Sequence, residues 1–517
     1  MSSRKDHNKS DSDSQRQIQA NWIATYVARF PVVRDRRGVV HFVTDSGKAI
    51  PVDSKQACEF LSAHYRQVAG QPLSPSGLKA ALSLLQQKAL ASTPAGELPV
   101  RVGVVRAGPG FDLERNDAVV VDLCDRGAAV KISGNGPELV KPSPIAFLRP
   151  PGMLALPEPV LDEFIPVRDA LAPLLPFALA PDDDRPIVLA VFLLAALLPL
   201  IPQPILVLTG EQGAGKSWLA KALRAVIDPH ATPLRRPPRD ERELFIAAHN
   251  NYVLAYDNLS GLPAWLGDAL CVISSGGGYA ARKLYTDSEE VIFPVRRPVV
   301  LTAIHAPLTR PDLVDRMFFV EVSRAGSPRS ELDLEQVLEA TRARLLGALA
   351  HSLTIALGLW QQYPIPQPIR LVDVHRLACA AAQYPGFGWS PEAVDRALRN
   401  NRDHLRQRVL EASPVGPLLV EVASLGFRGT TRQLLGHLAG MAPNIQARRG
   451  DFPTSPEALA KTLTELEPYL RAQGVVVRRY RAGHASDRII ELSRPKAGTP
   501  PHRQVVSLNP DDFEHEA

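Results

Sequence analysis

Apolar and polar positions along the chain follow two periods, and the changes of period divide it into segments. Apolar residues three or four positions apart predict helices at 18–29, 54–67 and 75–90. Short apolar runs between turn signals predict strands at 38–43, 100–106, 118–123 and 128–132. Together these helices and strands predict one N-terminal α+β domain over residues 18–165.

Helical and strand patterns alternate from residue 166 to about 370, which indicates an α/β core with helices packed on a mainly parallel sheet. Residues 371–411 have helical spacing with charged faces and predict a helical linker region. A smaller domain is expected over 412–495, where helices precede two basic strands. The chain ends, 1–17 and 496–517, are polar or proline-containing and are expected to be disordered.

Composition adds limits to this picture. The chain has 517 residues, of which 45% are hydrophobic, enough for several packed cores. The net charge of +5 fits an anionic partner without specifying one. The four cysteines form no CxxC pair, which argues against a zinc ribbon or a disulfide framework and suits the reducing cytoplasm. The apolar run 187–201 is shorter than the roughly 20 residues of a bilayer span, so it predicts a buried helix of a soluble protein.

A glycine-rich segment gives the clearest functional signal. Residues 205–209 are strand formers, 210–217 have the form G-x-x-x-x-G-K-[ST], and 218–227 have helical spacing. In this context the backbone N–H groups point at phosphate oxygens, the lysine reaches the β- and γ-phosphates, and the serine holds Mg²⁺. The residues expected to bind ATP are Gly210, Glu211, Gln212, Gly213, Ala214, Gly215, Lys216 and Ser217.

A second nucleotide signal follows in the segment 252–260. Mostly apolar residues precede Asp257, as on a buried strand that ends at a carboxylate. Such a carboxylate can hold the Mg²⁺ shell. A strand ending in Asp is often only a turn cap, but its place downstream of a phosphate loop favours a metal site with Ser217.

A basic hairpin is expected next. Strands at 281–285 and 290–294 are predicted to pair across a polar turn. The side chains expected to project from it toward DNA are Arg282, Lys283 and Tyr285. The alternative is a solvated hairpin whose charges protect the strand edges.

The order of phosphate loop, acidic strand, basic hairpin, strand with a polar tip and arginine before a strand resembles that of the AAA+ ATPases. It is most similar to the superfamily III helicases, including the helicase halves of phage and plasmid primase–helicases. The resemblance covers residues 200–322 and implies a ring, suspected to be a hexamer, with ATP between subunits. It implies that Thr302 senses the γ-phosphate and that Arg316 is the arginine finger offered to the neighbouring subunit. It also implies that Lys283 and its hairpin grip DNA in the central channel.

Two positions depart from the pattern of that family. Asn258 stands where many members have a second carboxylate, and Thr302 stands where they usually have Asn. Both departures are compatible with slow or DNA-stimulated hydrolysis. For Arg316 the alternative is a surface arginine that caps a helix, with Arg310 as the next candidate finger. The residues expected in catalysis are therefore Lys216, Asp257, Asn258, Thr302 and Arg316.

The last domain has the order of a winged helix. Helical patterns at 429–440 and 455–474 precede basic strands at 475–481 and 487–494. The residues expected to contact DNA are Lys461, Arg478, Arg479, Arg481 and Arg488. A winged helix that binds protein, or a simple packing domain, is the alternative.

These features predict an ATP-hydrolysing DNA-remodelling motor, a replicative helicase or initiator of a phage or mobile element. Its expected partners are DNA, further copies of the chain, and a separate primase or replication protein. One alternative is an ATP-switched DNA-binding regulator or helicase loader that hydrolyses slowly and does not unwind. A small-molecule kinase is a weaker alternative. In the N-terminal domain, Asp122 and Asp125 are not spaced as a metal-binding pair on one strand face, so we interpret the domain as an adaptor.

Overall fold

The computed structural model describes residues 15–35, 38–91, 98–108, 111–177, 179–180, 182–282, 290–304, 311–323, 330–441, 452–482 and 487–494. The chain forms two compact units, residues 1–402 and 403–517. The boundary lies inside helix α12 (Pro391–Ala412).

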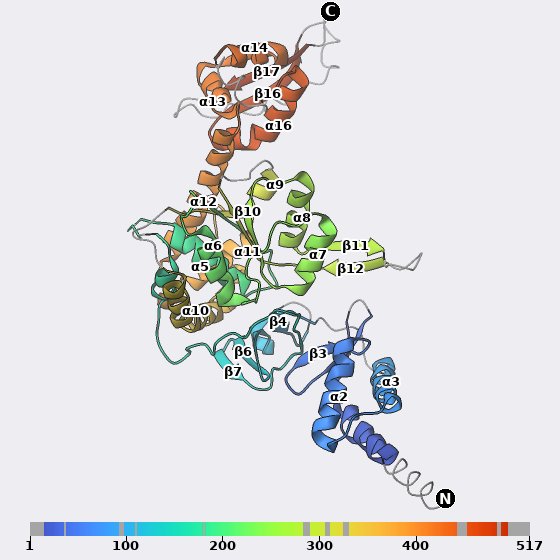
Figure 1. The fold of residues 1–517 in the computed structure, drawn as a ribbon. Coiled ribbons are helices and arrows are strands. Elements are labelled where there is room, and N and C mark those ends of the chain that lie inside the picture. The colour runs from blue at the N-terminus through green and yellow to red at the C-terminus, as the bar shows by residue number, and fades with distance from the viewer. Residues whose placement is uncertain are drawn as a thin grey trace, which may run out of the picture. The chain divides into compact units, whose positions relative to one another are not determined.

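A parallel four-stranded sheet forms the centre of the first unit (Figure 1). Its order is β10-β13-β9-β14. The strands are β9 (Ile205–Thr209), β10 (Leu254–Leu259), β13 (Val299–Ala303) and β14 (Met317–Glu321). Their residues are almost continuously apolar and buried, as expected of a sheet covered on both faces. The predicted α/β core is confirmed.

Helices cover both faces of this sheet (Figure 1). On one side lie α5 (Arg185–Ala196), α6 (Lys216–Ile227), α10 (Glu331–Leu359) and α11 (Val372–Ala381). On the other side lie α7 (Glu241–Asn250), α8 (Ala264–Ser275) and α9 (Pro311–Val314). A two-stranded ribbon, β11 (Gly278–Arg282) and β12 (Glu290–Pro294), projects beside α8. From Pro186 to its end α5 is buried, which confirms the buried helix predicted from the apolar run.

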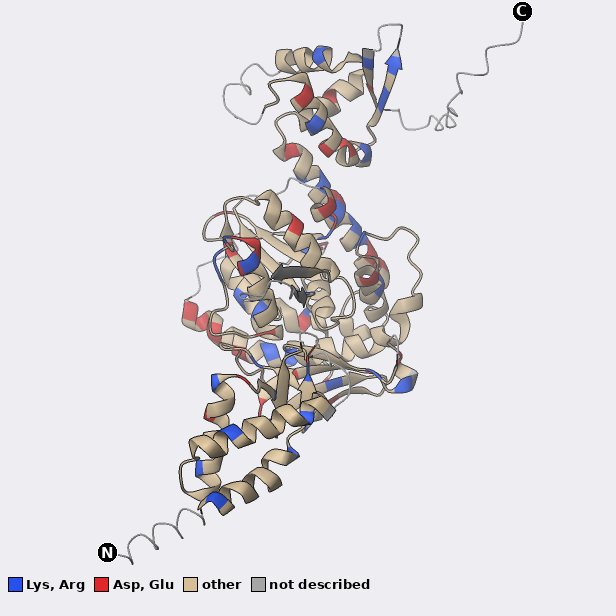
Figure 2. Ribbon diagram, turned by 90° about the vertical axis from the view of Figure 1, so that its right-hand side faces the viewer, with Lys and Arg blue, Asp and Glu red and all other residues tan. Residues whose placement is uncertain are grey.

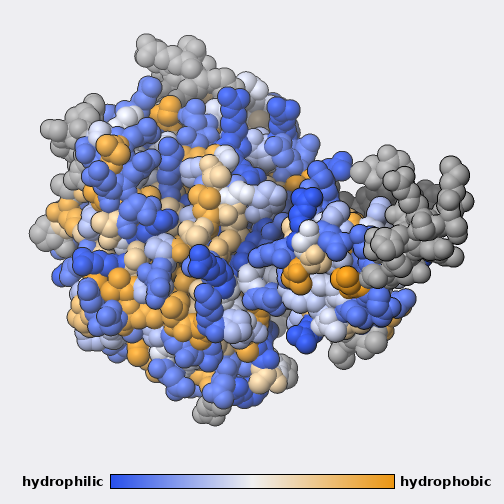
Figure 3. Space-filling view, turned by 60° about the horizontal axis from the view of Figure 1, so that its bottom comes forward, coloured by the Kyte–Doolittle hydropathy of each residue, from blue (hydrophilic) through white to orange (hydrophobic). Residues whose placement is uncertain are grey.

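One part of the described chain, Glu331–Gln362, is long and apolar enough to cross a membrane by length and composition alone. However, 61% of its most apolar window is buried inside the protein, as expected of a core helix. Elsewhere, exposed apolar side chains such as Leu90, Phe164 and Leu425 come from separate segments. Figure 3 shows apolar side chains interspersed with polar ones on the face that it displays.

Among the described residues before 166, two small sheets and three α-helices precede the core. The first sheet has the order β1-β2-β3-β8, and the second has the order β4-β5-β6-β7. The strands are β1 (Val32–Arg34), β2 (Val40–Val43), β3 (Lys48–Pro51), β4 (Val102–Val105), β5 (Ala118–Asp125), β6 (Ala128–Ser133), β7 (Gly136–Val140) and β8 (Phe147–Leu148). The helices are residues 15–25, α2 (Lys55–Ala69) and α3 (Pro75–Ala91).

The buried side chains divide this region differently from the predicted single domain at 18–165. Trp22, Leu61 and Leu85 belong to a separate N-terminal core. Val121 and Val130, in the second sheet, belong to the same core as α5, α6 and α10. The reason is that one face of the second sheet packs on α10. Residues 371–411 were predicted to form a separate linker region. Instead, α11 and the first half of α12 contribute buried side chains to the same large core as α5, α6 and α10.

Besides the end of α12, the described residues of the second unit form three helices and a three-stranded antiparallel sheet with the order β15-β17-β16. Its described elements are α13 (Gly416–Leu425), β15 (Phe427–Thr430), α14 (Thr431–Met441), α16 (Pro456–Ala472), β16 (Val476–Ala482) and β17 (Asp487–Ser493). The two helices and two strands expected here are present. The short strand β15 was not predicted, because its four residues include Gly429 and Thr430 and carry little strand signal.

Candidate nucleotide site

The glycine-rich loop joins the carboxyl end of β9 to the amino end of α6. Gly210, Gly213 and Gly215 have φ values of 141°, 79° and 92°, a backbone conformation that residues other than glycine rarely adopt. A Cβ atom on Gly210 would lie 2.1 Å from the carbonyl oxygen of Val322. The glycines therefore give the chain both its curvature and its close approach to the strand beside it.

Lys216 is the first residue of α6, and its side chain folds back over the loop. Its Nζ donates hydrogen bonds to the carbonyl oxygens of Gly210 at 2.8 Å and Glu211 at 2.7 Å. Burial lowers the pKa of Lys216, and the nearby Asp257 opposes that shift. The ammonium group thus lies at the mouth of the loop, where a phosphate would bind.

Asp257 lies on β10, where two hydroxyl groups converge on one of its oxygens. Ser217 Oγ donates to Asp257 Oδ1 at 2.9 Å, and Thr302 Oγ1 donates to the same oxygen at 2.5 Å. Thr302 reaches it from the neighbouring strand β13. Three residues that are far apart in the sequence therefore meet at the carboxyl edge of the sheet.

Asn258 has an irregular backbone. Its φ is 59°, and the register between β10 and β13 shifts between Tyr256 and Leu259. Asparagine tolerates the left-handed region better than most residues. Its N–H donates to Thr302 Oγ1 at 2.9 Å, while its side chain is exposed. The backbone N–H of Asn258, rather than its side-chain amide, thus takes part in the polar cluster.

The site suits a nucleotide phosphate and Mg²⁺ by its chemistry. The loop precedes a helix amino terminus at a point where β9 has neighbours on both sides, the usual place for ligands in such sheets. Ser217 and Asp257 offer a hydroxyl and a carboxylate oxygen 2.9 Å apart, and hard oxygen ligands suit Mg²⁺.

Two arginines beside the strands of the central sheet, Arg185 and Arg235, were not among the predicted site residues. Arg185 donates to the carbonyl oxygen of Glu321 at 3.0 Å and to Ser323 Oγ at 3.3 Å, at the end of the strand beside β9. Arg235 forms a single parallel bridge with Tyr256 at the outer edge of β10. The local sequence holds no signal for either, because both positions depend on pairing with distant strands.

Arg316 lies at the other edge of the sheet. It directly precedes β14, and its carbonyl oxygen accepts from the N–H of Ile205, where β9 begins. Its guanidinium donates to Ser275 Oγ and to the carbonyl oxygen of Asp312. The structure therefore does not bring Arg316 to the phosphate loop of its own chain, and its predicted role needs a second subunit.

The predicted hairpin is present as β11 and β12, but β11 lies three residues earlier than the predicted strand 281–285. Arg282 ends β11, opposite Glu290. Lys283 and Tyr285 lie outside the described residues.

Figure 2 shows basic residues on both helices and strands of the second unit, and their partners differ. Arg479 pairs with Glu467 of α16, which also holds Arg471. Arg478 lies directly opposite Glu491 on β17. Arg481 and Arg488 lie directly opposite each other, and both are exposed. Neither of these two pairs with a carboxylate whose side chain the structure describes.

Lys461 is exposed on α16. That helix also carries Glu457, Glu465 and Glu467, so its acidic residues outnumber its basic ones. The basic residues predicted to contact DNA are thus concentrated on the β16–β17 hairpin.

The N-terminal aspartates have structural partners. Asp122 is fully buried and accepts two hydrogen bonds of 2.7 Å from Arg149. Asp117 accepts from the N–H groups of Ala107 and Asp112. Among the described residues, no group of three or more His, Cys, Asp or Glu side chains could hold a metal ion.

Comparison with known families identifies the context of this site. A family model described as an actinomycete integrative conjugative element replication protein matches residues 169–398. A second, described as the AICE RepA C-terminal domain, matches residues 415–505. Over these two ranges, the chain matches a replication protein of a mobile element. The first range contains the whole nucleotide site, and the second contains the basic hairpin.

No curated protein matches the chain. Among solved structures, the apo C-terminal region of NrS-1 is 11% identical with a TM-score of 0.41, and the match covers 92% of this chain and 99% of that one. A full-length MCM homologue from Methanopyrus kandleri is 16% identical with a TM-score of 0.29, covering 69% and 89%. The function is therefore inferred from the family match and the site geometry.

Proposed function

We propose that the chain is an ATP-hydrolysing motor that remodels DNA during replication of a mobile element, acting in the cytoplasm as a helicase or initiator. The observation that carries the proposal is the convergence of Ser217, Asp257 and Thr302 beside a glycine-rich phosphate loop. The family match supplies the replication context. In this proposal the core is an AAA+ type P-loop ATPase of the superfamily III kind.

The loop residues 210–217 bind the phosphates of ATP, and Lys216 exchanges its two carbonyl partners for phosphate oxygens. Ser217 and Asp257 hold Mg²⁺, which when bound neutralises charge on the phosphates. Thr302 keeps Asp257 oriented through its hydroxyl group. These residues bind and position the nucleotide, which is most of what an enzyme contributes to phosphoryl transfer.

The proposed motor is a ring, because Arg316 lies at the sheet edge remote from its own phosphate loop. The family resemblance implies that this ring is a hexamer. In a ring, Arg316 completes the site of the adjacent subunit. The order of helices and strands in the second unit supports a winged helix that binds DNA through its hairpin. Arg282, Lys283 and Tyr285 are proposed to contact DNA in the channel, and a primase or another replication protein remains a proposed partner.

An ATP-operated DNA-binding switch without unwinding is the second candidate. The specific observation in its favour is Asn258, which stands where the resembled family often has a carboxylate and is an exposed residue on an irregular backbone. This arrangement supports binding of ATP more directly than fast hydrolysis.

ATP binding and turnover, each measured with and without single-stranded and duplex DNA, test the proposal. Wild type is compared with Lys216→Ala and Asp257→Asn. The motor predicts DNA-stimulated turnover that both substitutions abolish, followed by strand displacement. Tight ATP binding with negligible turnover on every DNA would favour the switch, and absence of ATP binding would refute both candidates.

A further inference from the structure

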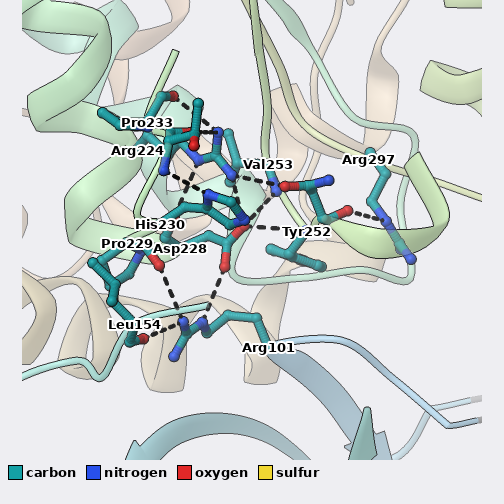
Figure 4. A network of polar contacts seen from close by, with 12 residues as sticks. Arg101, Leu154, Arg224, Asp228, Pro229, His230, Pro233, Tyr252, Val253 and Arg297 are labelled. Atoms are coloured by element: carbon teal, nitrogen blue, oxygen red, sulfur yellow. Dashed lines mark hydrogen bonds and ion pairs between the residues drawn. The ribbon is translucent and has the colours of Figure 1, made fainter. Parts of the chain in front are cut away.

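A buried charged cluster lies at the end of α6 that is remote from the phosphate loop (Figure 4). Asp228 directly follows α6 and is 2% exposed. Its Oδ2 accepts hydrogen bonds from the N–H groups of Tyr252 at 3.1 Å and Val253 at 3.0 Å, directly before β10. Asp228 therefore ties the end of α6 to the start of β10.

Arg101 brings a positive charge to this carboxylate from the N-terminal region. It directly precedes β4, is fully buried, and has a φ of 63°. Its Nε donates to Asp228 Oδ1 at 3.1 Å. Its other nitrogens donate to the carbonyl oxygens of Asp122 at 2.9 Å and Leu154 at 2.6 Å. The guanidinium fork thus connects the second N-terminal sheet to the turn after α6, as Figure 4 shows.

Arg224, on α6, is the second cation beside Asp228. Burial lowers its pKa to about 10, so it stays protonated at neutral pH. Its guanidinium lies 3.8 Å from Asp228 Oδ2, and its Nε donates to the carbonyl oxygen of Asp228 at 3.2 Å rather than to the carboxylate. Its other nitrogens donate to the carbonyl oxygens of Thr232 and Pro233 and to Asn251 Oδ1. Arg101 is therefore the closer counter-charge of Asp228.

The backbone strengthens the same joint. The N–H of Leu154 donates to the carbonyl oxygen of Pro229 at 3.0 Å, and the N–H of Ala231 donates to that of Gly152 at 2.8 Å. A Cβ on Gly152 would lie 2.5 Å from the ring of His230, so the two segments are in close contact. The N-terminal chain and the turn after α6 thus form one hydrogen-bonded body.

These contacts hold α6 and β10 together at both ends. At the near end, Ser217 donates to Asp257, and at the far end Asp228 joins the two elements. We propose that Arg101 is a positioning residue of the nucleotide site, which fixes the spacing of α6 and β10 by holding Asp228. The N-terminal sheet is then a structural part of the ATPase, and this inference rests on the proposed function.

The physical reason lies in the cost of a buried carboxylate. Asp228 without Arg101 would keep a more distant cation and two N–H donors, and water or a shift of the turn would have to supply the missing charge. Because α6 is a rigid rod of about 18 Å, a shift at its far end is carried to Ser217 at the other end. Displacement of about 1 Å in a catalytic group can reduce rates by about a hundredfold.

Turnover and amide hydrogen exchange of Arg101→Met, Arg101→Lys and Arg149→Met test the inference in the full-length chain. Arg149→Met is the matched control, because Arg149 forms a buried ion pair with the carboxylate of Asp122, whereas Arg101 contacts only the carbonyl oxygen of Asp122 and pairs with the carboxylate of Asp228. For Arg101→Met we expect kcat to fall about tenfold or more with a smaller change in KM, and faster exchange at Tyr252 and Val253. Arg101→Lys keeps the charge but not the fork, so an intermediate loss is expected.

The inference is overturned if Arg101→Met retains wild-type turnover, or if Arg149→Met alters turnover and exchange to the same degree. If Arg101→Met does not fold, Arg101→Lys decides, and wild-type turnover in that variant would contradict the proposal. Amide exchange needs no nucleotide. If the wild type hydrolyses no ATP, the proposed function fails, while unaltered exchange at Tyr252 and Val253 in Arg101→Met would still overturn the positioning role.

Discussion

At the scale of single residues, the environment of Asp257 explains how Thr302 can replace the expected asparagine. The hydroxyl group of Thr302 has one hydrogen, which it donates to Asp257, and the hydroxyl oxygen accepts from the N–H of Asn258. With its hydrogen committed in this way, Thr302 is better placed to orient the carboxylate than to donate to a γ-phosphate. The family resemblance implied a sensor, whereas the geometry favours a positioning role.

Replacing Thr302 by Val or Ser separates these roles. Thr302 is 1% exposed, and Val keeps its shape but lacks the hydroxyl group. A hydrogen bond to a charged group contributes roughly 1.5–3 kcal/mol, so Thr302→Val should lower kcat about ten- to hundredfold. Thr302→Ser should stay near wild type in the same steady-state ATPase assay. Wild-type turnover in Thr302→Val, with a loss in Thr302→Ser, would show that the methyl group rather than the hydroxyl matters.

Two loop glycines are predicted to differ in their tolerance of alanine. At Gly213 nothing lies within 4 Å of an added Cβ, so the cost is the left-handed backbone alone, roughly 1–2 kcal/mol. At Gly210 the added Cβ would also overlap the carbonyl group of Val322. Chemical denaturation should therefore show Gly210→Ala to be less stable than Gly213→Ala by at least about 1 kcal/mol. The reverse order would contradict the close approach of the loop to the end of β14.

At the scale of elements, the sequence was sufficient where the signal is local. The phosphate loop, β9 and α6 follow from adjacent residues, and the buried α5 follows from one apolar run. Contacts between distant segments were not predictable. Arg101 and Asp228 are 127 positions apart, and no periodicity connects them. The pairing of Arg479 with Glu467 was missed because it depends on how the hairpin packs on α16.

The β16–β17 hairpin should therefore contain two functional kinds of arginine. Arg481 and Arg488 are like charges on directly opposed residues, an arrangement that costs stability unless an anion binds there. If DNA phosphates bind there, Arg481→Ala or Arg488→Ala should each reduce the slope of log K against log salt by about 1. Arg479→Ala should leave that slope unchanged and lower the thermal stability, because its charge is held by Glu467. Salt-dependent DNA binding by fluorescence anisotropy measures the three slopes, and an equal decrease for all three variants would contradict this division.

At the scale of the whole molecule, the two edges of the central sheet carry different parts of the proposed reaction. The phosphate loop and Asp257 lie at the carboxyl edge, whereas Arg316 lies at the amino edge, about 16 Å away along five-residue strands. A head-to-tail assembly would bring the amino edge of one subunit to the carboxyl edge of the next. Arg316 would then act on the nucleotide site of the neighbouring subunit.

Mixing two inactive variants tests this arrangement. Arg316→Ala subunits have an intact loop, and Lys216→Ala subunits have an intact finger, so each should be inactive alone. In an equal mixture, about one quarter of the head-to-tail interfaces combine an intact loop with an intact finger, and about a quarter of wild-type turnover should return. The control is a mixture of Lys216→Ala with Asp257→Asn. It should stay inactive, because every subunit then lacks one residue of its own phosphate-binding site. If Arg316 only caps a helix, it acts within its own chain and mixing cannot restore turnover. Failure of the first mixture to regain turnover would therefore assign Arg316 to this structural role and contradict a nucleotide site shared between subunits.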